Sequence, residues 1–201
     1  MVISKVQQRS GHAAQVAFCA LSVAFMVIAA WITIPLGPIP FTLQTLAVMF
    51  VLFALQPKQA LAAIAAYLVL GGLGLPVFSS FKGGLAALVG PTGGFIVGFL
   101  VAGVLALACD ALMKRSKVFS SENTKRFFGT EIAAGTLARH LVMGVIFLTI
   151  LYAFDWVWLM QVGHLSAEAA FLAAVAPFVL IDICKMIAAV LLAQAVSRVV
   201  K

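Results

Sequence analysis

Long continuous apolar runs make up most of this chain, and polar residues are confined to short intervals between them. The runs are rich in Ala, Leu, Val and Phe and lack the alternation of a transmembrane β-strand, so they favour helices that cross a lipid bilayer. We expect an all-α integral membrane protein with six transmembrane helices in a compact bundle. The predicted helices cover about residues 13–34, 41–55, 59–75, 91–113, 130–154 and 167–200.

The composition agrees with a membrane protein. Of the 201 residues, 64% are hydrophobic and 9% are charged, and a soluble domain cannot bury that much apolar surface. No internal repeat or linker divides the chain, so we expect a single domain over residues 1–201. Basic residues precede the run at 13–34, as in a signal peptide, but this run is long and continues into a proline-rich segment. An uncleaved first helix is the favoured interpretation.

The formal net charge of +7 is unevenly distributed. Six spans place both termini on one side, and positive residues then gather on that side, as the positive-inside rule requires of the cytoplasmic face. If the segment 41–55 were re-entrant, the termini would lie on opposite sides and this agreement would be lost. No basic stripe with interleaved aromatics predicts nucleic-acid binding. The residues counted inside are Lys5, Arg9, Lys58, Lys114, Arg115, Lys117, Lys125, Arg126, Arg198 and Lys201.

Residues 34–46, IPLGPIPFTLQTL, contain three prolines and a glycine between two apolar segments. Proline fixes φ and has no N–H, so this segment is predicted to be a rigid extended loop. Thr42 and Gln44 follow directly, with Gln44 expected one turn into the second helix. Because an amide can donate and accept hydrogen bonds, Gln44 could contact a small molecule or bond to a neighbouring helix.

Asp182 and Lys185 lie three residues apart in the last predicted helix, which puts them on one face. Ionisable groups are costly at membrane depth, so they are expected to face the bundle interior or a wet cavity. Together they could hold a zwitterionic ligand or a ligand with a urea and an acid group. A purely structural ion pair is the alternative.

The segment 76–90 is rich in glycine and carries Lys82, the one cation predicted on the outer side. Its glycines would allow close approach of a ligand to the backbone, although an ordinary solvated lysine fits the pattern as well. Hydroxyl groups from Ser79, Ser80 and Thr92 lie nearby. The aromatic residues expected at the outer face are Phe41, Tyr67, Phe78, Trp156 and Trp158, and the two tryptophans are typical of an interfacial belt.

Inside the bundle, Asp110 is expected to pair with Arg139, and Glu131 is placed two helical turns before Arg139. Small residues at four-residue spacing allow helices to approach closely, either within the bundle or against another membrane protein. These pairs are Ala13/Ala17, Ala20/Ala24 and Gly94/Gly98. The three cysteines, Cys19, Cys109 and Cys184, fit no metal motif and are interpreted as packing residues.

The sequence contains none of the common catalytic motifs: no GxxxxGK[ST], HExxH, GxSxG or Cys/His cluster. It therefore shows no means of hydrolysing ATP. An intramembrane enzyme with Asp182 and Lys185 as acid and base is the remaining enzymatic alternative, and we expect a protein that is not an enzyme.

Four segments, IPLGPIPFTLQTL (34–46), YLVLGGLGLPVF (67–78), KGGLAALVGPTGGF (82–95) and PFVLIDICK (177–185), together resemble the BioY family. Its members are the biotin-specific substrate-capture (S) components of energy-coupling factor (ECF) transporters. The resemblance implies a six-helix bundle in the bacterial cytoplasmic (inner) membrane that binds biotin near its outer face. It also implies a transmembrane coupling protein and two cytoplasmic ABC ATPases as partners, and no cofactor.

The resemblance further implies which residues bind the ligand. Asp182 and Lys185 match the family's motif in the last helix, the loop after the third helix points to Ser80 and Lys82, and the PFTLQ segment points to Thr42 and Gln44. A small-residue patch on the first helix contacts the coupling protein, with Ala20/Ala24 the best match and Ala13/Ala17 also fitting. The loop differs from the family, which commonly has Asn or Gly where Ser79 and Ser80 stand.

The chemistry of biotin suits these side chains. Asp182 can accept from the ureido N–H groups, Gln44 or a hydroxyl can donate to the ureido carbonyl, and Lys82 or Lys185 can neutralise the valerate carboxylate. Apolar walls from Phe41, Tyr67 and Phe78 would cover the thiophane ring. An S component for a different vitamin is the nearest alternative.

Overall fold

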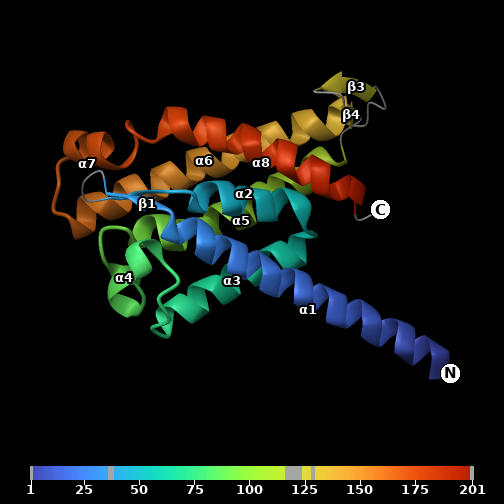
Figure 1. Cartoon of the computed structure of the whole chain (residues 1–201). Helices are drawn as coiled ribbons and strands as arrows, with labels where there is room; N and C mark the ends of the chain where they lie inside the picture. The colour runs from blue at the N-terminus through green and yellow to red at the C-terminus, as the bar shows by residue number, and fades with distance from the viewer. Residues whose placement is uncertain (1, 36–38, 116–123, 128–129, 200–201) are drawn as a thin grey trace.

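The computed structural model describes residues 2–35, 39–115, 124–127 and 130–199. Within these ranges the chain is a helical bundle with two small antiparallel sheets (Figure 1). The helices are α1 (Val2–Trp31), α2 (Gln44–Ala54), α3 (Pro57–Gly72), α4 (Leu85–Val89), α5 (Gly93–Met113), α6 (Ala134–Val162), α7 (Ala167–Ala174) and α8 (Val179–Val199). The sheets pair β1 (Thr33–Ile34) with β2 (Phe41–Thr42), and β3 (Thr124–Phe127) with β4 (Thr130–Ala133).

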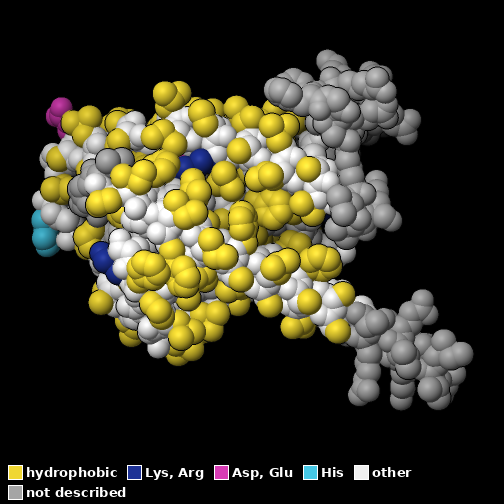
Figure 2. All heavy atoms as spheres, in the orientation of Figure 1, with side chains coloured by type: hydrophobic (Ala, Val, Ile, Leu, Met, Phe, Trp, Pro, Cys, Tyr) yellow, Lys and Arg dark blue, Asp and Glu magenta, His cyan; other side chains and the backbone are white. Residues whose placement is uncertain are grey.

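Four described helices are long and apolar enough to cross a membrane, and their apolar stretches cover residues 13–31, 93–113, 135–162 and 179–196. The chain is thus an all-helical membrane protein apart from its two small sheets. Many large apolar side chains are exposed, as expected of a surface that contacts lipid; for example, Leu180 is 74% exposed and Val16 is 68% exposed. Figure 2 shows this apolar surface, with few charged side chains on the face in view.

The shortest predicted span, residues 41–55, begins later than expected. Phe41 and Thr42 form β2, which pairs with β1 on the other side of the proline-rich segment. Helix α2 therefore starts at Gln44, which is its first residue and does not lie one turn inside it. The extended backbone predicted for this segment is confirmed at residues 34, 41 and 42, which lie in β1 and β2; residues 36–38 lie outside the described ranges.

The last predicted helix, residues 167–200, is two helices. α7 ends at Ala174 and α8 begins at Val179, with Pro177 between them. Proline has no N–H and its ring clashes with the preceding turn, so a continuous helix through this position is disfavoured. The break places Asp182 in the first turn of α8.

The basic segment after α5, predicted to be a loop up to residue 128, contains strand β3 where it is described. Helix α6 consequently begins at Ala134 and not at residue 130, and it extends to Val162. The position expected for Glu131 was wrong, because this residue lies on β4 opposite Arg126 and not on the helix of Arg139.

The predicted Asp110–Arg139 ion pair is confirmed at 2.7 Å, and Lys114 also lies 2.7 Å from Asp110.

Helix α2 lies at the centre of the bundle (Figure 1), where α1, α3, α5 and α8 all contact it. Ala47, Val48, Met49 and Val51 have no exposed surface. α5 packs along α6, and α1 packs on α3. The short elements α4, α7 and β1 lie at one end of this bundle (Figure 1). Strand β2 pairs with β1 there, and α8 begins shortly after α7.

Two glycines at the end of α3 differ sharply in their surroundings. A Cβ atom on Gly71 would overlap the ring of Phe78, which is fully buried. A Cβ atom on the next residue, Gly72, would meet only the tip of the Leu88 side chain, at 3.2 Å. Gly71 therefore allows the Phe78 ring to lie directly against α3.

We expect Gly71→Ala to destabilise the protein by about 1–3 kcal/mol, because the Phe78 ring must leave its packed position. Gly72→Ala is the matched control, with an expected change within about 0.5 kcal/mol. Thermal unfolding of the two detergent-purified variants checks this. Equal unfolding temperatures would show that Phe78 does not depend on the glycine.

Candidate functional site

A cavity of about 420 Å³, including its part open to solvent, lies between the β2–α2 junction, the first half of α5 and the start of α8. Its walls are largely apolar and include Ile39, Pro40, Phe95, Ile96, Phe99 and Phe178. The polar groups that converge on it belong to Thr42, Gln44, Thr45, Ser79, Thr92, Asp182 and Lys185.

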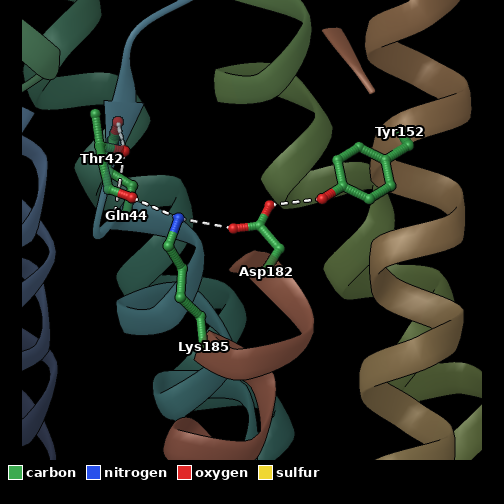
Figure 3. A network of polar contacts seen from close by, with 5 residues as sticks. All are labelled: Thr42, Gln44, Tyr152, Asp182 and Lys185. Carbon is green, nitrogen blue, oxygen red and sulfur yellow. Dashed lines mark hydrogen bonds and ion pairs between the residues drawn. The ribbon is translucent and has the colours of Figure 1, made fainter. Parts of the chain in front are cut away.

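Asp182 and Lys185 form a buried ion pair at this cavity (Figure 3). Lys185 Nζ lies 2.7 Å from Asp182 Oδ1. The two residues are 1% and 6% exposed, respectively. The prediction that they share one face of the helix is confirmed. The structure combines both interpretations left open by the sequence, because the two charges neutralise each other and also line a cavity.

Lys185 connects α8 to the segment before α2. Its Nζ donates to the backbone oxygen of Thr42 at 2.7 Å and lies 4.0 Å from the centre of the Phe41 ring. A cation over an aromatic face is attracted by the ring quadrupole. The Lys185 ammonium group thus uses two of its three N–H donors, one to Asp182 and one to the Thr42 oxygen. The third donor remains for another acceptor.

Tyr152, on α6, completes the site from the opposite side. Its hydroxyl donates to Asp182 Oδ2 at 2.7 Å, so each oxygen of the carboxylate receives one hydrogen bond (Figure 3). Sequence reasoning missed this residue. Tyr152 lies in the middle of a long apolar run, and its hydroxyl was the only signal that it could contact a polar group.

Gln44 is held in a chain of hydrogen bonds. Its Nε2 donates to the Tyr67 hydroxyl at 2.6 Å, and that hydroxyl donates to the Val77 oxygen at 3.0 Å. Thr42 Oγ1 donates to Gln44 Oε1 at 3.2 Å and accepts from the Gln44 N–H. The amide therefore forms the expected bond to a neighbouring helix, α3, and also lines the cavity.

Tyr67 and Phe78 form a layer behind the cavity. Both are fully buried, and their rings meet edge to face with centroids 5.4 Å apart. They support Gln44 and are not among the residues that line the cavity.

The remaining predicted site residues lie farther out. Ser80 and Lys82 are exposed and do not line the cavity, whereas their neighbour Ser79 does. Ser80 lies in a 3-10 turn (Ser79–Phe81) with a left-handed φ of 57°. Ala20 and Ala24, predicted to meet a partner, are exposed on α1 and take no part in the cavity.

The cavity offers a negative group, a positive group and an amide on apolar walls. Asp182 keeps lone pairs for N–H donors, and Lys185 keeps one donor for an acceptor. Such an arrangement suits a compact ligand with both kinds of polar group. Among the described residues, no group of His, Cys, Asp and Glu is placed to hold a metal ion.

Comparison with known proteins gives a consistent result. The BioY family model matches residues 4–201. The biotin transporter BioY of Thermotoga maritima is 35% identical over 175 residues, covering 87% of this chain and 90% of that protein. The probable biotin transporter BioY of Pyrococcus horikoshii is 34% identical over 184 residues, covering 90% of this chain and 95% of that protein.

A solved structure is also similar to this chain. It is the crystal structure of the S-component for biotin from an ECF-type ABC transporter, with a TM-score of 0.75 and 25% sequence identity. The similarity covers 94% of this chain and 93% of that one. The family match spans almost the whole sequence, and the related structure has the same fold over almost its whole length. The chain belongs to the BioY family.

Proposed function

We propose that this protein captures biotin with high affinity and takes part in its uptake across the membrane, as the S component of an ECF-type ABC transporter. The observation that carries the proposal is the buried Asp182–Lys185 pair at a small cavity, in a chain of the BioY family. The relatives are named as biotin transporters, which supports biotin over another vitamin and a transporter over an enzyme.

The ureido ring of biotin suits the inner part of the cavity. Its N–H groups can donate to the free lone pairs of Asp182, and its carbonyl can accept from the second amide proton of Gln44, which Thr42 orients, or from the third donor of Lys185. Leaving any of these buried groups unpaired costs about 1–3 kcal/mol. The site would therefore discriminate against ligands that lack the urea.

The valerate carboxylate is assigned to a lysine. Lys185 lies at the cavity, and Lys82 lies on the exposed turn that follows Ser79, with Ser80 beside it. We keep both lysines and Ser80 in the proposed binding site, together with Thr42, Gln44 and Asp182. Tyr67 and Phe78 are proposed to act through Gln44, since they support it from behind.

We further propose that residues 1–201 are one domain in the bacterial inner membrane, with six spans formed by α1, α2, α3, α5, α6 and α8. Both termini would be cytoplasmic. The amino end of α1, the carboxyl end of α8 and the β3–β4 hairpin lie toward one end of the bundle (Figure 1). The positive residues concentrate in these same segments, which supports the orientation.

The proposed partners are an ECF coupling protein and two cytoplasmic ABC ATPases, which would supply the energy. Ala20 and Ala24 lie one turn apart on α1 and are exposed. Small side chains at this spacing let another helix approach closely. We assign this patch to the coupling protein; neither alanine lines the ligand cavity.

Calorimetric titration of biotin into the purified protein, freed of carried-over ligand, is the direct test. We expect saturable binding that thiamine does not reproduce. Asp182→Asn should weaken it at least about 100-fold, because the charge that accepts the ureido N–H groups and balances Lys185 is lost. Normal biotin affinity in a folded Asp182→Asn protein would contradict the assigned role.

Tyr152→Phe should weaken biotin binding about tenfold, because the Asp182 carboxylate loses the hydroxyl that fixes one of its oxygens. The same substitution should have no further effect in the Asp182→Asn background, where its target is already altered. A double-mutant cycle of binding constants measures this coupling. Fully additive effects would show that Tyr152 acts independently of Asp182.

Cysteine labelling tests the orientation. In a background without Cys19, Cys109 and Cys184, a membrane-impermeant maleimide should label Lys82→Cys in intact cells. It should label Lys58→Cys and Lys114→Cys only after the membrane is opened, since these positions are proposed to be cytoplasmic. Labelling of all three positions in intact cells would rule out the proposed topology.

A further inference from the structure

Asp155 is an acidic residue in the packed interior that the proposed binding site does not use. It lies on α6, three residues after Tyr152, and has no exposed surface. Among the described residues, none forms a hydrogen bond of standard distance and angle with either of its carboxyl oxygens. An acidic side chain at such a place is expensive in a membrane protein and therefore calls for a specific role.

The carboxyl group of Asp155 lies against the first turn of α5. A Cβ atom on Gly94 would overlap Asp155 Oδ1, so this glycine provides the space for the acid. The backbone N–H of Phe95, the next residue, faces the carboxyl group. Gly94 and Phe95 are the second and third residues of α5.

The start of α5 needs a partner of this kind. The first N–H groups of a helix have no acceptor within the helix, and their partial positive charge favours an acidic group. Thr92, the residue that precedes the helix, forms no capping hydrogen bond with its side chain. An oxygen supplied by the neighbouring helix can take the place of that local cap.

A second contact from α6 reinforces the same junction. Trp158 lies one turn beyond Asp155, its Nε1 donates to the Gly90 oxygen at 3.0 Å, and a Cβ on Gly94 would also meet its side chain at 2.7 Å. α6 therefore holds the α4–α5 turn through the indole and the first turn of α5 through the acid.

The first turn of α5 forms one wall of the ligand cavity. Thr92, Phe95 and Ile96 all line it. The Phe95 ring packs edge to face against Tyr152 and Phe178, with centroids 6.2 and 6.0 Å apart. A shift of this turn would therefore move the wall opposite Asp182 and disturb the ring next to Tyr152.

We propose that Asp155 is a positioning residue for the ligand site: its carboxyl group caps α5 from the neighbouring helix and so fixes the α5 wall of the cavity. It touches no ligand. The inference rests on the proposed function, because it concerns the wall of the cavity assigned to biotin.

The test compares Asp155→Leu, Asp155→Asn and Gly94→Ala, with Val157→Ala on the exposed side of α6 as the matched control. Asparagine keeps an oxygen that can accept from α5, whereas leucine has none. Gly94→Ala keeps the acid, but its methyl group displaces both the Asp155 carboxyl group and the Trp158 side chain from the first turn. This variant keeps the proposal testable if Asp155→Leu fails to fold.

Hydrogen–deuterium exchange of residues 92–98 reports on the cap without any ligand. We expect exchange about fivefold faster in Asp155→Leu and Gly94→Ala, and near the wild-type rate in Asp155→Asn and Val157→Ala. The biotin dissociation constant should rise about tenfold in Asp155→Leu and stay within about threefold in Asp155→Asn. A role in stability alone would lower the unfolding temperature and leave this constant unchanged.

Unchanged exchange in both Asp155→Leu and Gly94→Ala overturns the proposal. Unchanged biotin affinity in an Asp155→Leu protein whose α5 has loosened overturns it as well. A wild-type protein that binds no biotin contradicts the proposed function, and the exchange measurement then decides by itself whether Asp155 caps α5.

Discussion

A pair of opposite charges 2.7 Å apart lies inside a bundle whose core is mostly apolar, and contacts from two helices and one strand satisfy it. Removing one partner of a buried pair costs about 3–5 kcal/mol, because the other charge is left without compensation. Asp182 and Lys185 compensate each other's charge because they lie three residues apart on one face of α8. Tyr152 then brings α6 to the acid, and the Thr42 backbone brings the β2–α2 junction to the base. The contacts that satisfy the pair also fix the cavity beside it.

The extended segment before α2 has a related role. Because β1 and β2 pair with each other, the chain turns back on itself before the helix begins, and the Thr42 carbonyl is left facing Lys185. A helix that started at Phe41 would have used that oxygen within its own first turns. The late start of α2 is therefore part of how the site is built.

Much of this arrangement could be predicted from local sequence. Two charges three residues apart in an apolar run have few ways to be satisfied, so the shared face of Asp182 and Lys185 followed directly from helix geometry. The break before α8 had a signal in Pro177, which was outweighed by the continuous apolar run around it. Tyr152 and Asp155 were not predicted as site residues because their roles depend on which helix packs against α6. The placement of Ser80 and Lys82 outside the cavity depends on a left-handed turn that short-range patterns do not determine.

Helix α2 has 11 residues, which corresponds to about 16 Å along its axis, and a bilayer core is about 30 Å thick. The cavity lies at its amino end, where Thr42, Gln44 and Thr45 line it. The rest of α2 packs tightly in the core beyond the cavity, and its Val48 and Val51 side chains are fully buried. This central helix is thus a packed apolar segment next to the polar end of the cavity. Along the described length of α2 the cavity is therefore closed off by packed apolar side chains, and its polar groups are confined to the end of the helix at which it opens.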